Sequence, residues 1–364
     1  MAGMKAVVCL VLSVLLGTAV CAQESSNPNW IRPDHRSSDP VWGAKNGIVF
    51  SLWPYGVENS GNRYGGGPRG LIRVGYESGG EVHMINFLAI EPVVDGKMEF
   101  SEISPSVVDG VWGKLLWAGD TPTPGPYHPS AKTRGTISRI GEGAGAAEEL
   151  AVFVFMERFA NGAAPYLRLS IRSDRPEELC VQVFHHDQSA LMDRCAITAT
   201  MGNYPRLRRL HLKNGVIRSE QLYAGFDGID FIEKESFPGS EMLEDKAGNR
   251  WVFATGNEPI AQLLAWPEDS LAKTKLNWKY RTPFKLTQYW KKEKGDVDPS
   301  LVVRVNGRAR YWSGGSRDTS HYMPIPGGPS FENFELREKY VAGQKFYYGL
   351  TKRTPEEIIK ADSL

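Results

Sequence analysis

The sequence predicts an all-β protein, a large antiparallel β-sandwich with long Gly/Pro-rich loops and a short C-terminal helix. The chain contains 38 Gly and 23 Pro in 364 residues, and without a collagen-like repeat these residues mark many turns. Short runs of β-branched and aromatic residues lie between the turns. We find no alternation of strands with helices and no internal repeat, which favours a sandwich over an α/β fold or a propeller.

The predicted strands follow one another from residue 47 almost to the C-terminus. They cover residues 47–53, 70–76, 82–90, 150–156, 166–172, 181–184, 206–213, 251–255, 260–265, 301–306 and 344–349. We expect a helix at residues 355–360, because Thr354 can cap it and Pro355 suits its first turn. No linker divides the chain, so residues 46–350 are expected to form one domain, and residues 351–364 a helical tail.

The N-terminus has the pattern of a secretory signal. Lys5 precedes an apolar run, and Val20-Cys21-Ala22 supplies small residues for cleavage before Gln23. We therefore expect residues 1–22 to be a signal peptide and residues 23–45 to be a polar N-terminal arm. The mature protein is expected outside the cytoplasm, either extracellular or periplasmic, and no later apolar run is long enough for a membrane span.

Charge and cysteine content limit the classes of partner and cofactor. With 43 basic and 42 acidic side chains, the protein lacks the overall positive field that nucleic acid binding favours. Export permits a disulfide between Cys180 and Cys195, but a hairpin turn near Ser189 would place Cys180 opposite residue 199 instead. Cys/His spacing typical of zinc sites is missing from the sequence, so no cofactor is predicted; calcium could bind in an Asp-rich loop, but no spacing requires it.

Two segments suggest a relationship to a known group of proteins. Residues 327–350 (GGPSFENFELREKYVAGQKFYYGL) and 198–213 (TATMGNYPRLRRLHLK) resemble the galactose-mutarotase-like proteins, a group that includes secreted bacterial carbohydrate-active proteins. The resemblance implies a two-sheet super-sandwich, a fold that recurs in polysaccharide lyases and some glycoside hydrolases. The resemblance rests on the pattern of residue types along strand-like segments, so it assigns no catalytic residue.

One group of residues suits elimination from an acidic polysaccharide. His186 ends a strand on its polar face, and the catalytic candidates Asn203, Tyr204 and Arg206 precede a strand whose outer face carries Arg209, His211 and Lys213. If the two strands are neighbours, a His base, a Tyr acid and cations that neutralise a uronate converge. We therefore predict a polysaccharide lyase in which Arg209, His211 and Lys213 bind the substrate. The alternative is a hydrogen-bonded sheet histidine beside surface ion pairs.

Two further segments indicate a glycan ligand. Residues 271–295 interleave eight Lys or Arg with aromatic rings, and rings that include Trp278 and Trp290 could stack on sugars while the cations bind acidic groups. Arg317, His321 and Tyr322 lie in a Gly-rich loop and are further substrate-binding candidates. The aromatic residues of 271–295 could equally fill the core.

Two other functions stay open. A glycoside hydrolase on the same fold needs two carboxylates across its substrate, and the candidate acids are Glu91, Asp187, Asp227 and Asp230. A non-catalytic glycan-binding protein also fits the aromatic loops.

Overall fold

The computed structural model describes residues 29–33, 40–52, 69–125, 133–200, 207–256, 282–310 and 324–361. In the first half of the chain the strands are β1 (Trp30–Ile31), β2 (Val41–Ala44), β3 (Ile48–Leu52), β4 (Ile72–Ser78), β5 (Glu81–Val94), β6 (Lys97–Met98), β7 (Leu116–Gly119), β8 (Thr136–Ile140), β9 (Ala147–Met156), β10 (Pro165–Arg172) and β11 (Arg175–His185). In the second half they are β12 (Arg194–Thr200), β13 (Leu207–Leu212), β14 (Gly215–Arg218), β15 (Glu235–Pro238), β16 (Leu243–Glu244), β17 (Arg250–Gly256), β18 (Thr287–Lys292), β19 (Val302–Arg308), β20 (Ser330–Arg337) and β21 (Gln344–Thr351), with helices α1 (Ser219–Leu222) and α3 (Pro355–Ala361).

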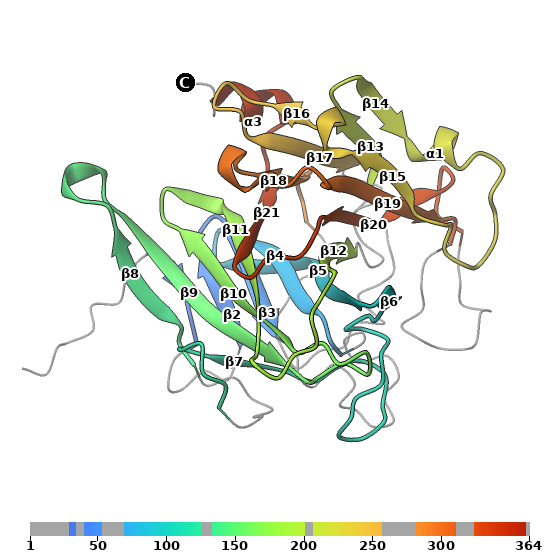
Figure 1. The fold of residues 1–364 in the computed structure, drawn as a ribbon. Coiled ribbons are helices and arrows are strands. Elements are labelled where there is room, and N and C mark those ends of the chain that lie inside the picture. The colour runs from blue at the N-terminus through green and yellow to red at the C-terminus, as the bar shows by residue number, and fades with distance from the viewer. Residues whose placement is uncertain are drawn as a thin grey trace, which may run out of the picture.

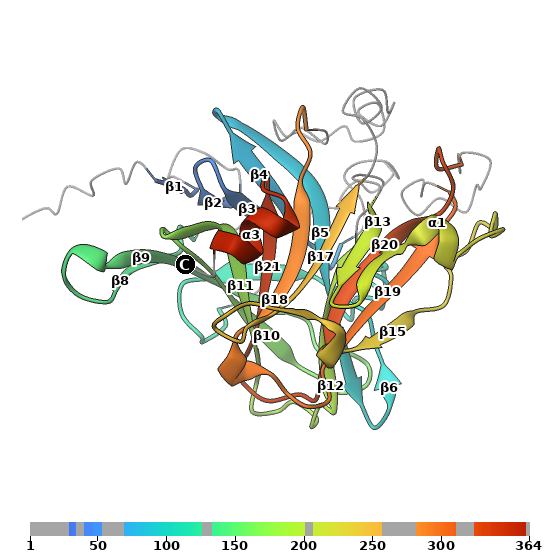
Figure 2. The same ribbon diagram turned by 90° about the horizontal axis from the view of Figure 1, so that it is seen from above.

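All strand pairs are antiparallel, and they form one continuous sheet that consists of two halves (Figures 1 and 2). The first half-sheet runs in the order β1–β2–β3–β4–β5–β12–β20–β19–β15. The second runs β14–β13–β17–β18–β21–β11–β10–β9, with β7 and β8 along β9. The halves join where Leu207 of β13 pairs with Phe331 of β20.

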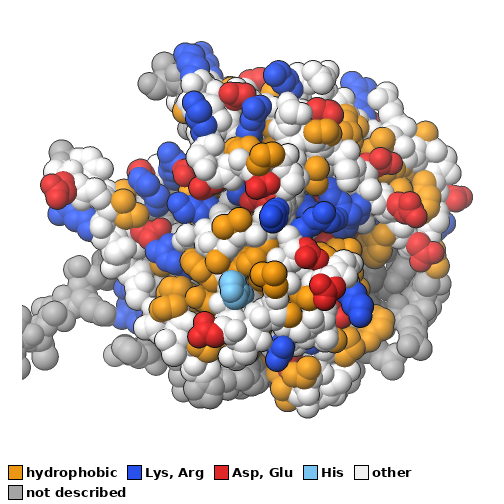
Figure 3. Space-filling model, in the orientation of Figure 1, with side chains coloured by type: hydrophobic (Ala, Val, Ile, Leu, Met, Phe, Trp, Pro, Cys, Tyr) orange, Lys and Arg blue, Asp and Glu red, His pale blue; other side chains and the backbone are white. Residues whose placement is uncertain are grey.

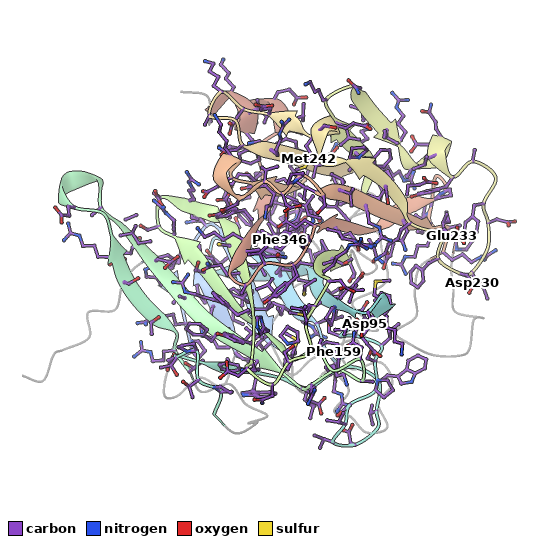
Figure 4. The ribbon with its side chains drawn as sticks, viewed as in Figure 1. Asp95, Phe159, Asp230, Glu233, Met242 and Phe346 are labelled. Carbon is purple, nitrogen blue, oxygen red and sulfur yellow. The ribbon has the colours of Figure 1, made fainter. Side chains whose placement is uncertain are left out.

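The two half-sheets pack face to face around one large apolar core. On β10, for example, Leu167, Leu169 and Ile171 alternate with more polar residues and are buried. Hydrogen bonds cross between the halves: Asn86 Nδ2 on β5 donates to Gln288 Oε1 on β18 over 2.8 Å. Figure 4 shows Phe346 in the middle of the molecule, between the two halves. The predicted antiparallel β-sandwich is confirmed.

The C-terminal helix also agrees with its prediction. Thr354 caps α3, because the Glu357 backbone N–H donates to Thr354 Oγ1 over 3.3 Å and the Thr354 N–H donates to Glu357 Oε2 over 2.8 Å. This reciprocal pair is a capping box. None of the helices in the described ranges is long and apolar enough to cross a membrane.

Three sequence-based expectations about individual segments change. Part of the predicted N-terminal arm forms strands, since β1 pairs with β2, and β2 pairs with β3. Strands β11 and β12 lie in different half-sheets rather than in one hairpin, and Cys180 and Cys195 are free thiols. Residues 287–292 and 330–337 form β18 and β20, which lie outside the predicted strand ranges but within two segments whose residue pattern is also typical of strands. The predicted strand 260–265 lies outside the described residues.

Candidate functional site

His186 follows the last residue of β11, where it packs against aromatic rings. Its ring stacks on Tyr166 at a centroid distance of 4.7 Å and lies 6.0 Å from Phe155. Burial lowers its pKa, the negative charge of Asp187 opposes that shift, and the neighbouring His185 ring adds to it. The ring is therefore neutral near pH 7, as a proton acceptor must be.

The structure does not bring His186 next to the cationic strand. In the second half-sheet, β21, β18 and β17 lie between β11 and β13, which separates the two strands by about 19 Å at about 4.8 Å per strand. Arg209 and His211 share one face of β13, as the alternation predicted, but His211 Nε2 bonds Thr255 Oγ1 over 2.9 Å. The expected convergence of His186 with Arg209, His211 and Lys213 is therefore wrong.

Trp290 does not face a ligand. Its side chain is fully buried, its Nε1 donates to the Phe334 carbonyl over 2.8 Å, and its ring packs against Tyr348. The core alternative for this ring is correct, and the predicted role in substrate binding is not. Seven other predicted site residues lie outside the described residues: Asn203, Tyr204, Arg206, Trp278, Arg317, His321 and Tyr322.

The four candidate carboxylates differ sharply in burial. Asp187, Asp227 and Asp230 are exposed, and Figure 4 shows Asp230 at the rim of the molecule. Glu91 is fully buried on β5, where it forms part of a hydrogen-bonded group of side chains. Only one of the four predicted acids is therefore buried among polar partners.

The carboxylate cluster comprises Glu91, Thr198, Lys234, Arg304 and Glu335. Thr198 Oγ1 lies 2.7 Å from Glu91 Oε1 and 2.6 Å from Glu335 Oε2. Lys234 Nζ donates to both oxygens of Glu91 over 3.0 Å and to Glu335 Oε2 over 2.6 Å. The Arg304 guanidinium forms an ion pair with Glu335 Oε1 at 2.9 Å.

Strand alternation and register bring these side chains together. Glu91 is opposite Ala196, Thr198 is opposite Glu335, and Glu335 is opposite Arg304. Their neighbours along the strands, such as Ile90 and Leu336, point into the core, so the cluster lies on the outer face of the first half-sheet. Four adjacent strands, β5, β12, β20 and β19, thus contribute one polar side chain each.

Two loops cover this outer face. Lys234 comes from the segment before β15, which is tethered by a hydrogen bond from the Ile232 N–H to the Gly307 carbonyl over 2.9 Å. The Phe100 ring, on the segment after β6, lies 5.9 Å from Lys234 Nζ. The side chains of Glu91 and Glu335 have no exposed area, whereas Lys234 keeps 12%. Lys234 is therefore the solvent-facing member of the carboxylate–lysine contact.

Burial changes the acidity of this group. It raises the pKa of Glu91 to about 7, with a further contribution from the negative charge of Glu335. Burial alone would lower the pKa of Lys234, but the attraction of Glu335 and Glu91 outweighs it and the pKa is raised. Burial and the charge of Glu91 also raise the pKa of nearby Glu102 to about 8. The cluster consequently combines a charged ammonium with acids that exchange protons near neutral pH.

The Thr198 hydroxyl shows how a proton is shared. A hydroxyl carries one hydrogen, so it can donate to only one of two carboxylates. Its contact with the second carboxyl is a hydrogen bond only when that carboxyl is protonated and donates to Thr198. The raised pKa of Glu91 makes Glu91 the proton-carrying partner. The cluster can therefore supply one carboxylic acid and one carboxylate at the same time.

We find no candidate metal centre in the described ranges. No group of three or more His, Cys, Asp or Glu side chains there is arranged to hold an ion. In the carboxylate cluster, the position between the two acids is occupied by the Lys234 ammonium.

Comparisons with known proteins add no assignment. No protein-family model, no curated protein and no solved structure matches this chain. The resemblance to galactose-mutarotase-like proteins stays a prediction.

Sequence reasoning found Glu91 but missed Thr198, Lys234, Arg304 and Glu335. A usable signal existed for Glu335, because it lies between Phe334 and Leu336, and a carboxylate inside an apolar strand points away from the core and needs a partner. No such signal marks Lys234, which precedes its strand between Glu233 and Glu235.

Proposed function

We propose that the protein is an exported enzyme that hydrolyses an extracellular polysaccharide, with Glu91 and Glu335 as its two catalytic carboxyl groups. The observation that carries the proposal is the sharing of one hydroxyl and one ammonium by two fully buried carboxyl groups. Glycoside hydrolysis uses two carboxyl groups in different protonation states. This arrangement supports the hydrolase among the functions that the sequence left open.

Each acid has a distinct role in the proposed reaction. Glu91, whose pKa is raised to about 7, protonates the glycosidic oxygen as it leaves. Glu335, which contacts the cations Lys234 and Arg304, is the carboxylate that attacks or stabilises the sugar. In the state described here Lys234 closes the space between the two acids, so a sugar that reaches Glu91 must displace the ammonium.

The spacing of the acids suggests the stereochemical outcome. Glu91 Oε1 and Glu335 Oε2 both lie within 2.7 Å of Thr198 Oγ1, so these two oxygens are less than about 5.4 Å apart. Retaining glycosidases place their carboxyl groups about 5–5.5 Å apart, and inverting enzymes about 6.5–9.5 Å. Because the upper bound lies below the separation in inverting enzymes, we expect retention of configuration at the anomeric carbon.

The elimination reaction has less support. It relied on His186 meeting the cations of β13, and these groups are separated by three strands. The lowered pKa of His186 is compatible with a base, but none of the described cations of β13 is beside it to bind a uronate.

The test is incubation with a panel of neutral and uronate-containing polysaccharides. New reducing ends report any cleavage, and ultraviolet absorbance of an unsaturated uronate reports elimination. We expect reducing ends without the absorbance, and a loss of at least about a hundredfold in turnover for Glu91→Gln and Glu335→Gln. Glu233→Gln is the matched control, because Glu233 is exposed on the same segment as Lys234.

The outcomes separate the three functions. Unsaturated product would replace the hydrolase with the lyase. Tight binding without any cleavage would make the protein a glycan-binding protein. Full activity of both glutamine variants would remove the carboxylate cluster from catalysis.

A further inference from the structure

Three arginines lie beside the carboxylate cluster on the same outer face. Arg304 is directly opposite Glu335, and Arg337 follows two residues later on β20. Arg194 begins β12, where its partner across the sheet is Lys339, two residues beyond Arg337. Because Cys195 and Leu336 point into the core, Arg194 and Arg337 point to the outer face.

Too few carboxylates are available for these arginines. Arg304 pairs with Glu335, which Lys234 also contacts. Within the described residues, neither Arg194 nor Arg337 forms an ion pair with a carboxylate. Burial lowers the pKa of Arg337, and the positive charges of Arg304 and Arg194 lower it further than the attraction of Glu335 and Glu91 raises it. The three guanidinium groups therefore repel one another, and an anion between them would relieve that repulsion.

The surface reflects this surplus of positive charge. In the space-filling view, Lys and Arg side chains gather over the strands labelled β12 and β20 in Figure 1 (Figure 3). Arg194 is exposed, Arg337 is half-buried and the Arg304 side chain keeps 13% exposure. All three can meet a ligand that approaches from solvent, and their planar forks suit the two oxygens of a carboxylate or sulfate.

We propose that Arg194, Arg304 and Arg337 bind the carboxylate or sulfate group of an acidic glycan. The inference rests on the proposed function, because it places the anionic group of the substrate next to the acids that cleave it. It assigns the acidic substrate to the first half-sheet instead of to Arg209 on β13 and Lys213 directly after it.

A glycan suits this site better than a nucleic acid. The arginines are three charges beside two buried acids, whereas nucleic acid carries closely spaced phosphates and is bound by extended basic surfaces. The whole chain has a formal charge of only +1. A polymer with one acidic group per sugar can place that group on the arginines and its glycosidic oxygen nearer Glu91.

The experiment measures binding of three polysaccharide probes by the purified protein across a range of salt concentrations. Polygalacturonate carries carboxylates, dextran sulfate carries sulfates, and dextran is neutral. The double variant Arg194→Gln/Arg337→Gln is compared with Arg139→Gln/Arg218→Gln, which removes two exposed arginines from β8 and β14. A thermal melt of each variant confirms folding.

We expect the wild type to bind one acidic probe and not dextran, and the Arg194/Arg337 variant to lose at least about tenfold in affinity. Preference for polygalacturonate identifies a uronate, and preference for dextran sulfate identifies a sulfate ester. Equal affinity of both double variants, equal binding of dextran, or stronger binding of single-stranded DNA would each overturn the proposal.

Failure of this inference can be told apart from failure of the hydrolase. Glu335→Gln should abolish cleavage while keeping the acidic probe bound. If the wild type binds the probe through the arginines and cleaves nothing, the result supports the arginine binding site and contradicts the hydrolase function.

Discussion

Glu91 of β5 and Glu335 of β20 bind the same ammonium: Lys234 Nζ lies 3.0 Å from Glu91 Oε1 and 2.6 Å from Glu335 Oε2. The two strands are not neighbours, since β12 lies between them and contributes Thr198 to the same contact. Three strands and one loop thus meet around this ammonium.

Removing the ammonium should destabilise the fold. Lys234→Met leaves Glu91 and Glu335 buried against each other without their shared cation, and breaking a buried ion pair costs about 3–5 kcal/mol. Chemical denaturation at pH 7 measures the change in the free energy of unfolding. At pH 5 the loss should be smaller, because the unpaired carboxyls then take up protons. Lys213→Met, at an exposed position, should change stability by less than about 0.5 kcal/mol, and a similar loss in both variants would contradict this account.

Stability should fall as the pH rises from about 5 to 7. The folded-state pKa of Glu91 is raised to about 7, so the folded protein binds this proton more tightly than the unfolded chain does. That contribution is fully present below the unfolded pKa and is lost as the pH rises through the folded pKa. Glu91→Gln should therefore reduce the dependence of the free energy of unfolding on pH. The exposed Glu233→Gln should leave the profile unchanged, and an unaltered slope in Glu91→Gln would argue against a raised pKa.

Trp290→Ala should act on stability rather than on glycan binding. The ring is buried against Tyr348 and its N–H is bonded to the Phe334 carbonyl, so we expect a loss of about 3–5 kcal/mol. Trp112→Ala is the control, because Trp112 is 61% exposed and should cost less than about 1 kcal/mol. Thermal melts of the two variants measure the change in stability. A folded Trp290→Ala protein with normal stability and weak glycan binding would show that Trp290 contacts the ligand.

His186→Ala should keep most of the activity. The ring stacks on Tyr166, and the loss of an aromatic pair costs about 0.5–1.5 kcal/mol. If Glu91 and Glu335 carry the chemistry, turnover should stay within about twofold of the wild type. If His186→Ala loses a hundredfold in turnover while Glu335→Gln stays active, the hydrolase proposal is wrong and the lyase with His186 as its base is favoured.

Local patterns in the sequence were sufficient for the fold class and for much of its detail. Alternation along residues such as Leu167, Leu169 and Ile171 predicts strands because every second side chain faces one side of a sheet. Thr354 and Pro355 predict the C-terminal helix, because capping depends on residues within one turn. These interactions are short in sequence, so they can be predicted without knowing the tertiary structure.

Only the tertiary structure decided which strands are neighbours, and the candidate site depends on that. His186 and Arg209 are close in sequence, yet β21, β18 and β17 separate their strands. Glu91 and Glu335 are far apart in sequence, yet they share Lys234. Strand order in a large antiparallel sheet is set by how the whole apolar core closes, because each strand's pattern fits many partners equally well. The same closure buries Glu91 and so sets its pKa, which no local pattern of residues could reveal.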